Sequence, residues 1–148
     1  MKKILLSFCL LMLSISIFAT DISGNQFGIW DLIGSPYNII GEITVPTNET
    51  LQIEAGVEVI AMGNYKITAL GNILASGTLN DTIRFYGNNN LNWGGLRLED
   101  ETNESTFDYC RISNTDDMNN YPIQSINSPI FIDHSFFDDH QSGISFFA

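Results

Sequence analysis

The fold class of this chain is decided by residues 43–59, which read ITVPTNETLQIEAGVEV. This stretch contains three triplets in which a central polar residue separates two apolar ones: Ile43-Thr44-Val45, Leu51-Gln52-Ile53 and Val57-Glu58-Val59. Successive side chains of a β-strand point to opposite faces. Each triplet therefore predicts a short strand with one buried face and one face in water.

The strand pattern continues towards the C-terminus. Six further triplets follow: Tyr65-Lys66-Ile67, Ile73-Leu74-Ala75, Ile83-Arg84-Phe85, Leu96-Arg97-Leu98, Phe107-Asp108-Tyr109 and Ile130-Phe131-Ile132. The turns between them contain residues that tolerate positive φ, namely Gly56, Gly63, Gly71, Gly77, Gly87, Gly94, Gly95 and Asn88-Asn89-Asn90. Short strands at this spacing, with no helical pattern, predict an all-β solenoid of about four or five stacked coils, each of roughly 20 to 25 residues.

An internal repeat supports the coil interpretation. Residues 105–109 align with residues 128–132 at an offset of 23, and a second short strand follows each, Cys110-Arg111-Ile112 and Ser135-Phe136-Phe137. Both second strands then enter polar turns. The repeat is degenerate, because a coil constrains only the size of its inward residues and the geometry of its turns.

The two ends of the chain predict different segments. Residues 1–20 have the pattern of a cleaved secretory signal peptide, with Lys2-Lys3 before an apolar run from Ile4 to Phe18. We therefore expect a secreted or cell-surface protein with no membrane insertion in its mature form. Residues 21–41 break the strand rhythm and are predicted to form an N-terminal cap.

The parallel β-helix is assigned to residues 42–148. Its last residues, Ile144 to Ala148, form another strand-like stretch with no polar coil or charged edge after it. An uncovered strand edge of this kind invites pairing. We therefore expect a helix truncated at its C-terminal end, continued by further coils or by another protomer.

The charge of the chain narrows the classes of partner. The formal net charge is −11, and loss of Lys2 and Lys3 with the signal makes the mature part more acidic still. Its cations are then Lys66, Arg84, Arg97 and Arg111. Nucleic-acid binding needs basic surface, so that class is excluded, and anionic membrane is disfavoured. Acidity suits solubility, calcium, or a neutral or cationic ligand.

The cysteines do not predict a disulfide. Cys9 leaves with the signal, and Cys110 then has no partner. Cys110 lies in a strand-like stretch without an adjacent His or Lys to activate it, so we expect a small buried hydrophobic residue there.

An ordered set of residues resembles the opening of secreted bacterial right-handed parallel β-helix repeat proteins, of the pectin lyase-like superfold. The matching positions are Trp30, Ser35-Pro36-Tyr37, Gly41-x-Ile43-x-Val45-Pro46, Thr50-Leu51-x-Ile53-Glu54-x-Gly56-Val57-x-Val59, Gly71-Asn72-Ile73-Leu74-Ala75-x-Gly77-Thr78, Ile83-x-Phe85 and Trp93-Gly94-Gly95-Leu96. The resemblance implies a coil of three short parallel sheets with apolar ladders inside. It also implies that ligands bind along the outer face of one sheet.

A second resemblance concerns catalysis. Asn114-Thr115-Asp116, and Asp138-Asp139 about one coil later, are similar to motifs of polygalacturonases, which share this superfold. On that reading Asp138 donates the proton and Asp116 and Asp139 activate water. However, His140 follows where that family has Cys, and its Gly-His-Gly and Arg-x-Lys elements are absent. We therefore expect no catalytic residues. If the chain is catalytic after all, Asp116, Asp138 and Asp139 are the candidates.

Calcium is the candidate cofactor. Acids cluster at Glu99-Asp100-Glu101, Asp116-Asp117 and Asp138-Asp139, and Arg84, Arg97 and Arg111 are each expected to point outward beside apolar neighbours. No Asp-x-Asp-x-Asp-Gly calcium loop is present. His134 and His140, with Asp133 and Asp139, form no standard metal spacing and are expected to be ordinary surface residues.

The leading functional hypothesis is a secreted, non-catalytic β-helix module that acts as a spacer or as a carbohydrate-contacting scaffold. Exposed aromatic residues such as Tyr86 can stack on sugar rings, whereas Trp93 is expected to pack in the core. The alternative is the N-terminal part of a polysaccharide-degrading enzyme, either a polygalacturonase-like hydrolase or a lyase.

Overall fold

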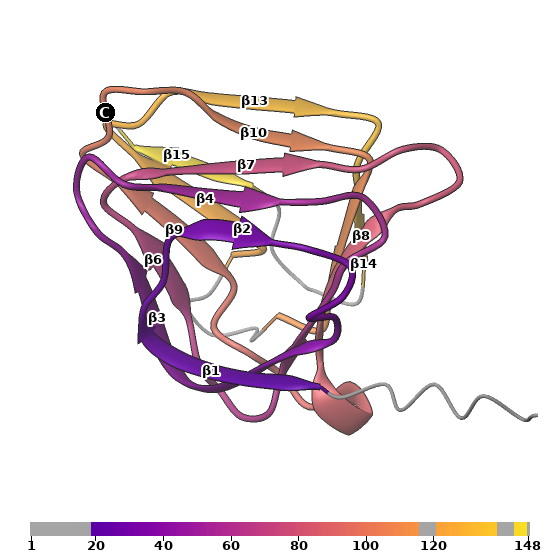
Figure 1. Cartoon of the computed structure of the whole chain (residues 1–148). Helices are drawn as coiled ribbons and strands as arrows, with labels where there is room; N and C mark the ends of the chain where they lie inside the picture. Colours follow the sequence, from indigo (N-terminus) through magenta and orange to yellow (C-terminus); the bar gives the residue numbers. More distant parts are fainter. Residues whose placement is uncertain (1–18, 116–120, 139–143, 148) are drawn as a thin grey trace, which may run out of the picture.

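Fifteen short strands build the protein, as a computed structural model shows for residues 19–115, 121–138 and 144–147. The strands pair in parallel and stack as a solenoid of about four turns (Figure 1). The one helix in these ranges is the single 3-10 turn η1 (Asn88–Asn90). The predicted all-β parallel solenoid is therefore confirmed. The described residues contain no helix long and apolar enough to cross a membrane.

Each turn contributes one strand to each of three rows. Row 1 contains β2 (Gly28–Trp30), β4 (Thr50–Ile53), β7 (Asn72–Ser76), β10 (Ser105–Asp108) and β13 (Ile130–Asp133). Row 2 contains β5 (Glu58–Ala61), β8 (Ile83–Gly87), β11 (Cys110–Ser113) and β14 (Phe136–Asp138). Row 3 contains β6 (Ile67–Ala69), β9 (Leu96–Glu99), β12 (Ile123–Ile126) and β15 (Ser145–Phe147).

Rows 2 and 3 meet at one long strand, β3 (Tyr37–Val45). Its residues 37–39 pair with β5 and its residues 43–45 pair with β6. The strand therefore turns a corner of the solenoid between these two segments. The remaining strand, β1 (Thr20–Asn25), runs parallel to β3 along both segments. The region predicted as a cap, residues 21–41, thus forms most of β1, all of β2 and the first part of β3 and follows the strand pattern of the turns after it.

Register aligns inward side chains of successive turns into apolar ladders. In row 1 the ladder is Trp30, Ile53, Ala75, Phe107 and Ile132. The small Ala75 lies next to the large Phe107, whose ring also packs edge-on against Phe85 at a centroid distance of 6.5 Å. The small side chain of Ala75 leaves room for the large ring of Phe107, as close packing of an interior requires.

The predicted repeat offset of 23 is wrong by two residues. Ser105 pairs with Ile130, an offset of 25, so Ser128 is not its counterpart. Ser128 lies in the loop between β12 and β13. There its hydroxyl donates to the Ile126 carbonyl and accepts from the Glu101 amide. A shift of two residues keeps every side chain on its predicted face. It does change which outward residues are neighbours, and Asp108 lies beside Asp133 for this reason.

The turn glycines serve two different purposes. Gly56 and Gly95 have φ of +79° and +69°, as the sequence predicts. Gly71 and Gly87 have no positive φ. A Cβ at Gly71 would instead collide with the carbonyl oxygens of Pro46 and Glu49, and one at Gly87 with the carbonyl oxygen of Leu91. Close approach of backbone, rather than positive φ, therefore requires these two glycines.

Two predictions about buried residues are confirmed. Trp93 lies in the core and its indole N–H donates to the Ser113 carbonyl at 2.8 Å. Cys110 is fully buried, and loss of hydration raises the pKa of its thiol to about 12. Since the thiolate is the reactive form, Cys110 serves as a core residue.

Candidate functional site

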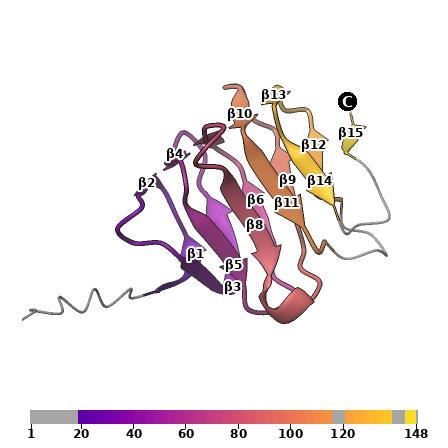
Figure 2. The same cartoon turned by 90° about the vertical axis from the view of Figure 1, so that its right-hand side faces the viewer.

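The outer surface of row 2 collects the residues best suited to ligand binding. Figure 2 views the molecule from this side, with β5, β8, β11 and β14 in front. Arg84, Arg111 and Phe136 are partners in register and form one exposed outward ladder, because the residues of a strand alternate between its two faces. Ser113 and Asp138 form a second pair two residues further along their strands. We call this surface the row-2 face.

Ion pairs between neighbouring strands balance the charge of the row-2 face. Arg84 Nη1 lies 3.3 Å from Glu58 Oε1, and Arg111 Nε donates to Asp138 Oδ2 at 3.1 Å. The Tyr86 hydroxyl donates to Glu58 Oε2 at 3.2 Å, and burial followed by the Glu58 charge raises the pKa of Tyr86. The outward arginines predicted from the sequence are confirmed. The row-2 face of this strongly acidic chain therefore carries paired charges.

An open groove borders this face where the chain passes from row 1 to row 2. Its volume is about 500 Å³, and it is lined by Leu79, Thr82, Tyr109, His134, Ser135 and Phe136. Three successive turns contribute to it. Leu79 and Thr82 come from the loop between β7 and β8, which projects from the solenoid (Figure 1). Leu79 and Phe136 are 78% and 72% exposed. The groove therefore presents apolar and aromatic surface to solvent.

Two rings stack inside the groove. Tyr109 and His134 both have positive φ, at 47° and 44°, which ends each row 1 strand and turns the chain into row 2. The rings lie 4.4 Å apart and nearly parallel, with an interplanar angle of 2°. A smaller hollow of about 240 Å³ follows on the row-2 face, lined by Arg84, Tyr86, Asn90, Arg111, Ser113 and Asn114.

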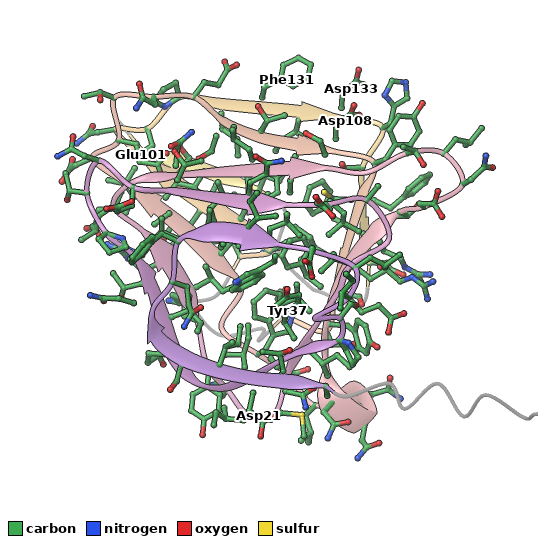
Figure 3. All side chains as sticks on the ribbon, in the orientation of Figure 1. Asp21, Tyr37, Glu101, Asp108, Phe131 and Asp133 are labelled. Carbon is green, nitrogen blue, oxygen red and sulfur yellow. The ribbon has the colours of Figure 1, made fainter. Side chains whose placement is uncertain are left out.

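His134 is held by two carboxylates. Its Nδ1 lies 3.2 Å from Asp108 Oδ1 and 3.2 Å from Asp133 Oδ2. Figure 3 shows Asp108 and Asp133 together at the ends of β10 and β13. The three side chains offer donor atoms within 4.8 Å of one another, which a divalent metal can use. In this structure the contacts fix the imidazole over Tyr109 instead. The part played by Asp108 does not follow from the predicted offset of 23, which places Phe131 and not Asp133 opposite Asp108.

Of the three predicted catalytic carboxylates, Asp138 lies within the described residues. Ser113 pairs with Asp138, so Asn114-Thr115 and Asp138 lie on successive turns, as the motif comparison expects. Asp138 is engaged by Arg111 on the row-2 face. Asp116 and Asp139 lie outside the described residues, as do Asp117 and His140. The predicted carboxylate cluster therefore stays a prediction.

A buried acid at the opposite end of row 1 forms a second candidate site. Glu101 lies in the turn before β10 (Figure 3). It is only 5% exposed. Its Oε2 accepts from the Ser105 hydroxyl at 2.8 Å, whereas its Oε1 is buried without a hydrogen-bond partner among the described residues. Desolvation raises the pKa of Glu101 to about 7. Nothing in the sequence distinguishes Glu101 from Glu99 and Asp100, which are less buried. Asp100, with φ of 53°, resets the alternation and turns Glu101 inward.

Replacing Glu101 with Gln is expected to change how stability depends on pH. The carboxyl has a pKa of 4.5 when unfolded and about 7 when folded, so between these values the folded state holds a proton that the unfolded state has lost. The free energy of unfolding of the parent protein should therefore fall by about 1.4 kcal/mol per pH unit from this group. Above pH 7 the contribution should level off.

Urea unfolding in the presence of a chelator, from pH 5 to 8.5, measures this effect. The difference between parent and Glu101→Gln should shift by about 2 to 3 kcal/mol across the range, in favour of Gln at high pH. Glu99→Gln, at an outward position paired with Arg97, is the control and should follow the parent curve. Parallel curves for the parent and Glu101→Gln would contradict the assignment.

Comparisons with protein-family models, with curated proteins and with solved structures found no match to this chain.

Proposed function

We propose that this protein is a secreted or cell-surface β-helix module without catalytic activity, and that its row-2 face binds a polysaccharide. The observation that supports this most is the combination of exposed Phe136 and the stacked Tyr109 and His134 with paired charged groups on one open face. Aromatic faces cover the apolar C–H surface of a sugar ring. The neighbouring guanidinium and carboxylate groups supply donors and acceptors for hydroxyl groups.

The shape of the face suits an extended polymer. Neighbouring strands of a sheet lie about 4.8 Å apart, so outward positions recur at a fixed interval along the solenoid. Arg84, Arg111 and Phe136 occupy three consecutive positions of this kind. The groove and the smaller hollow lie beside them, and the larger of the two is within the size range of pockets that bind small ligands.

Charge favours a neutral polysaccharide. Both arginines of the row-2 face are paired with carboxylates of adjacent strands, so they do not form an unbalanced cationic patch. The rest of the protein is strongly acidic and repels polyanions at a distance. Neutral hydroxyl groups can use such paired donors and acceptors without separating them. A polyuronate would have to displace Glu58 or Asp138.

Calorimetric titration with neutral hexasaccharides of β-1,4-linked glucose, xylose and mannose tests this function, with hexagalacturonate as the anionic comparison. At least one neutral ligand should bind, and Phe136→Ala should weaken it about threefold to tenfold through loss of stacking. Phe131→Ala removes an exposed aromatic from row 1 and should leave the affinity unchanged. Equal losses in the two variants, or preference for hexagalacturonate, would contradict the proposal.

The alternative function is the N-terminal part of a polysaccharide-degrading enzyme. It is favoured by Asp138, which lies one turn from Asn114-Thr115 and borders the proposed binding face. Release of reducing ends or of unsaturated uronate, lost in Asp138→Asn, would support this alternative. We expect no release from either neutral or uronate polymers.

A further inference from the structure

The corner between rows 3 and 1 contains a small polar cavity, apart from the row-2 face. Its volume is about 100 Å³, which exceeds the space of one water molecule. Seven of its nine lining residues have side-chain oxygens, among them Asn48, Asn72, Asp100, Glu101 and Thr102. The donors come from three successive turns of the solenoid.

The Glu101 carboxylate is the feature of this cavity that indicates a missing ligand. Its side chain lines the cavity and is 95% buried, with Oε1 unpaired among the residues that the structure describes. A buried carboxylate oxygen without a hydrogen bond is costly unless a proton, a water molecule or a cation compensates it. Ser105 fixes the other oxygen at 2.8 Å, and the hydroxyl of Ser105 in turn accepts from the Ile73 amide. These two hydrogen bonds orient the carboxylate and leave Oε1 as its unpaired oxygen among the described residues.

The chemistry of the lining selects the type of cation. Calcium takes six to eight oxygen ligands in flexible geometry, from carboxylates, amide and backbone carbonyls, and water. Among the residues that the structure describes, no Cys or His lines this cavity, so these residues do not offer the nitrogen and sulfur ligands that zinc and copper favour. The Asp100 carboxylate at the rim is oriented by the Asn127 amide, which donates to its Oδ1 at 3.0 Å.

We propose that this corner is a calcium site, with Glu101 as its buried carboxylate ligand and Asp100 as a second ligand at the rim. Bound calcium would neutralise Glu101 and join three turns of the solenoid through oxygens of Asn48, Asn72, Asp100 and Glu101. Its expected role is to stabilise the stack. The site is separate from carbohydrate binding, so failure of either proposal leaves the other standing.

Titration of the chelator-treated full chain with calcium chloride at pH 8 tests the site by calorimetry and thermal unfolding. We expect binding of one ion and a rise in the unfolding temperature. Glu101→Gln keeps the shape of the side chain but removes its charge, and should weaken calcium at least tenfold. Glu99→Gln should bind within about twofold of the parent.

Three outcomes would overturn the proposal. The first is no heat and no thermal shift with millimolar calcium in the parent protein. The second is unchanged affinity in Glu101→Gln. The third is binding that persists in Glu101→Gln and disappears in His134→Ala, which would place the ion at Asp108, Asp133 and His134. If Glu101→Gln does not fold, Asp100→Asn replaces it, and a loss of affinity of less than threefold would count against the site.

Discussion

Substitution of Gly95 by Ala should destabilise the protein by about 3 kcal/mol or more. Gly95 has φ of +69°, and its carbonyl accepts the Ile67 amide of the preceding turn at 3.1 Å. On the other side, a Cβ would collide with the Tyr121 carbonyl and lie 3.2 Å from the Pro122 carbonyl. Backbone on both sides cannot move without breaking the pairing of row 3. The expected loss therefore combines strain with a clash.

Gly24→Ala is the matched control. Gly24 has nearly the same φ, +71°, but apart from its own chain neighbours no atom of the described residues lies within 4 Å of the position of a Cβ. Ala there should cost only about 1 kcal/mol, the strain of the left-handed conformation. Urea unfolding of both variants separates the two contributions. Equal losses would show that Gly95 is required for its φ alone, and would contradict the close approach of the Tyr121 turn.

Removal of the Phe107 side chain should have an effect of similar size. Phe107 is 0% exposed, lies in the row 1 ladder between Ala75 and Ile132, and packs against Phe85. Because its small neighbour Ala75 cannot fill the space, Phe107→Ala should leave a cavity and cost about 3 to 5 kcal/mol. The midpoint of urea unfolding measures the change.

Phe131→Ala provides the comparison on the adjacent strand. Phe131 is 47% exposed and points outward from β13 (Figure 3). Its replacement should change stability by no more than about 0.5 kcal/mol. A large loss in Phe131→Ala with a small one in Phe107→Ala would mean that the strand faces are reversed.

The fold was predictable because the inward residues are simple to recognise. Triplets such as Leu51-Gln52-Ile53 and Leu96-Arg97-Leu98 follow the period of a strand, and their apolar residues are buried as expected. Strand ends were harder to place. Tyr109 was expected to end a strand, but its positive φ makes it a turn residue. A triplet alone does not show where the pairing stops.

The candidate sites were less predictable because they depend on register between turns. Alignment of the two serines in the sequence predicts that Ser128 pairs with Ser105. The hydrogen bonds of Ser128 instead place it in the loop before β13. That error hid the contact of Asp108 with His134. Glu101 was hidden for a related reason, since the positive φ of Asp100 reverses the alternation and acid residues are normally expected in water.

The central claim is that the row-2 face binds a neutral glycan, and an NMR titration of the amide spectrum tests it most directly. The ligand is the neutral hexasaccharide that binds most tightly in the calorimetric series. We predict shifts confined to residues 77–87, 109–114 and 134–138, with the amides of β6, β9 and β12 unchanged. Chemical-shift changes concentrated in the strands of row 3, or no changes with any of the three neutral ligands, would contradict the account.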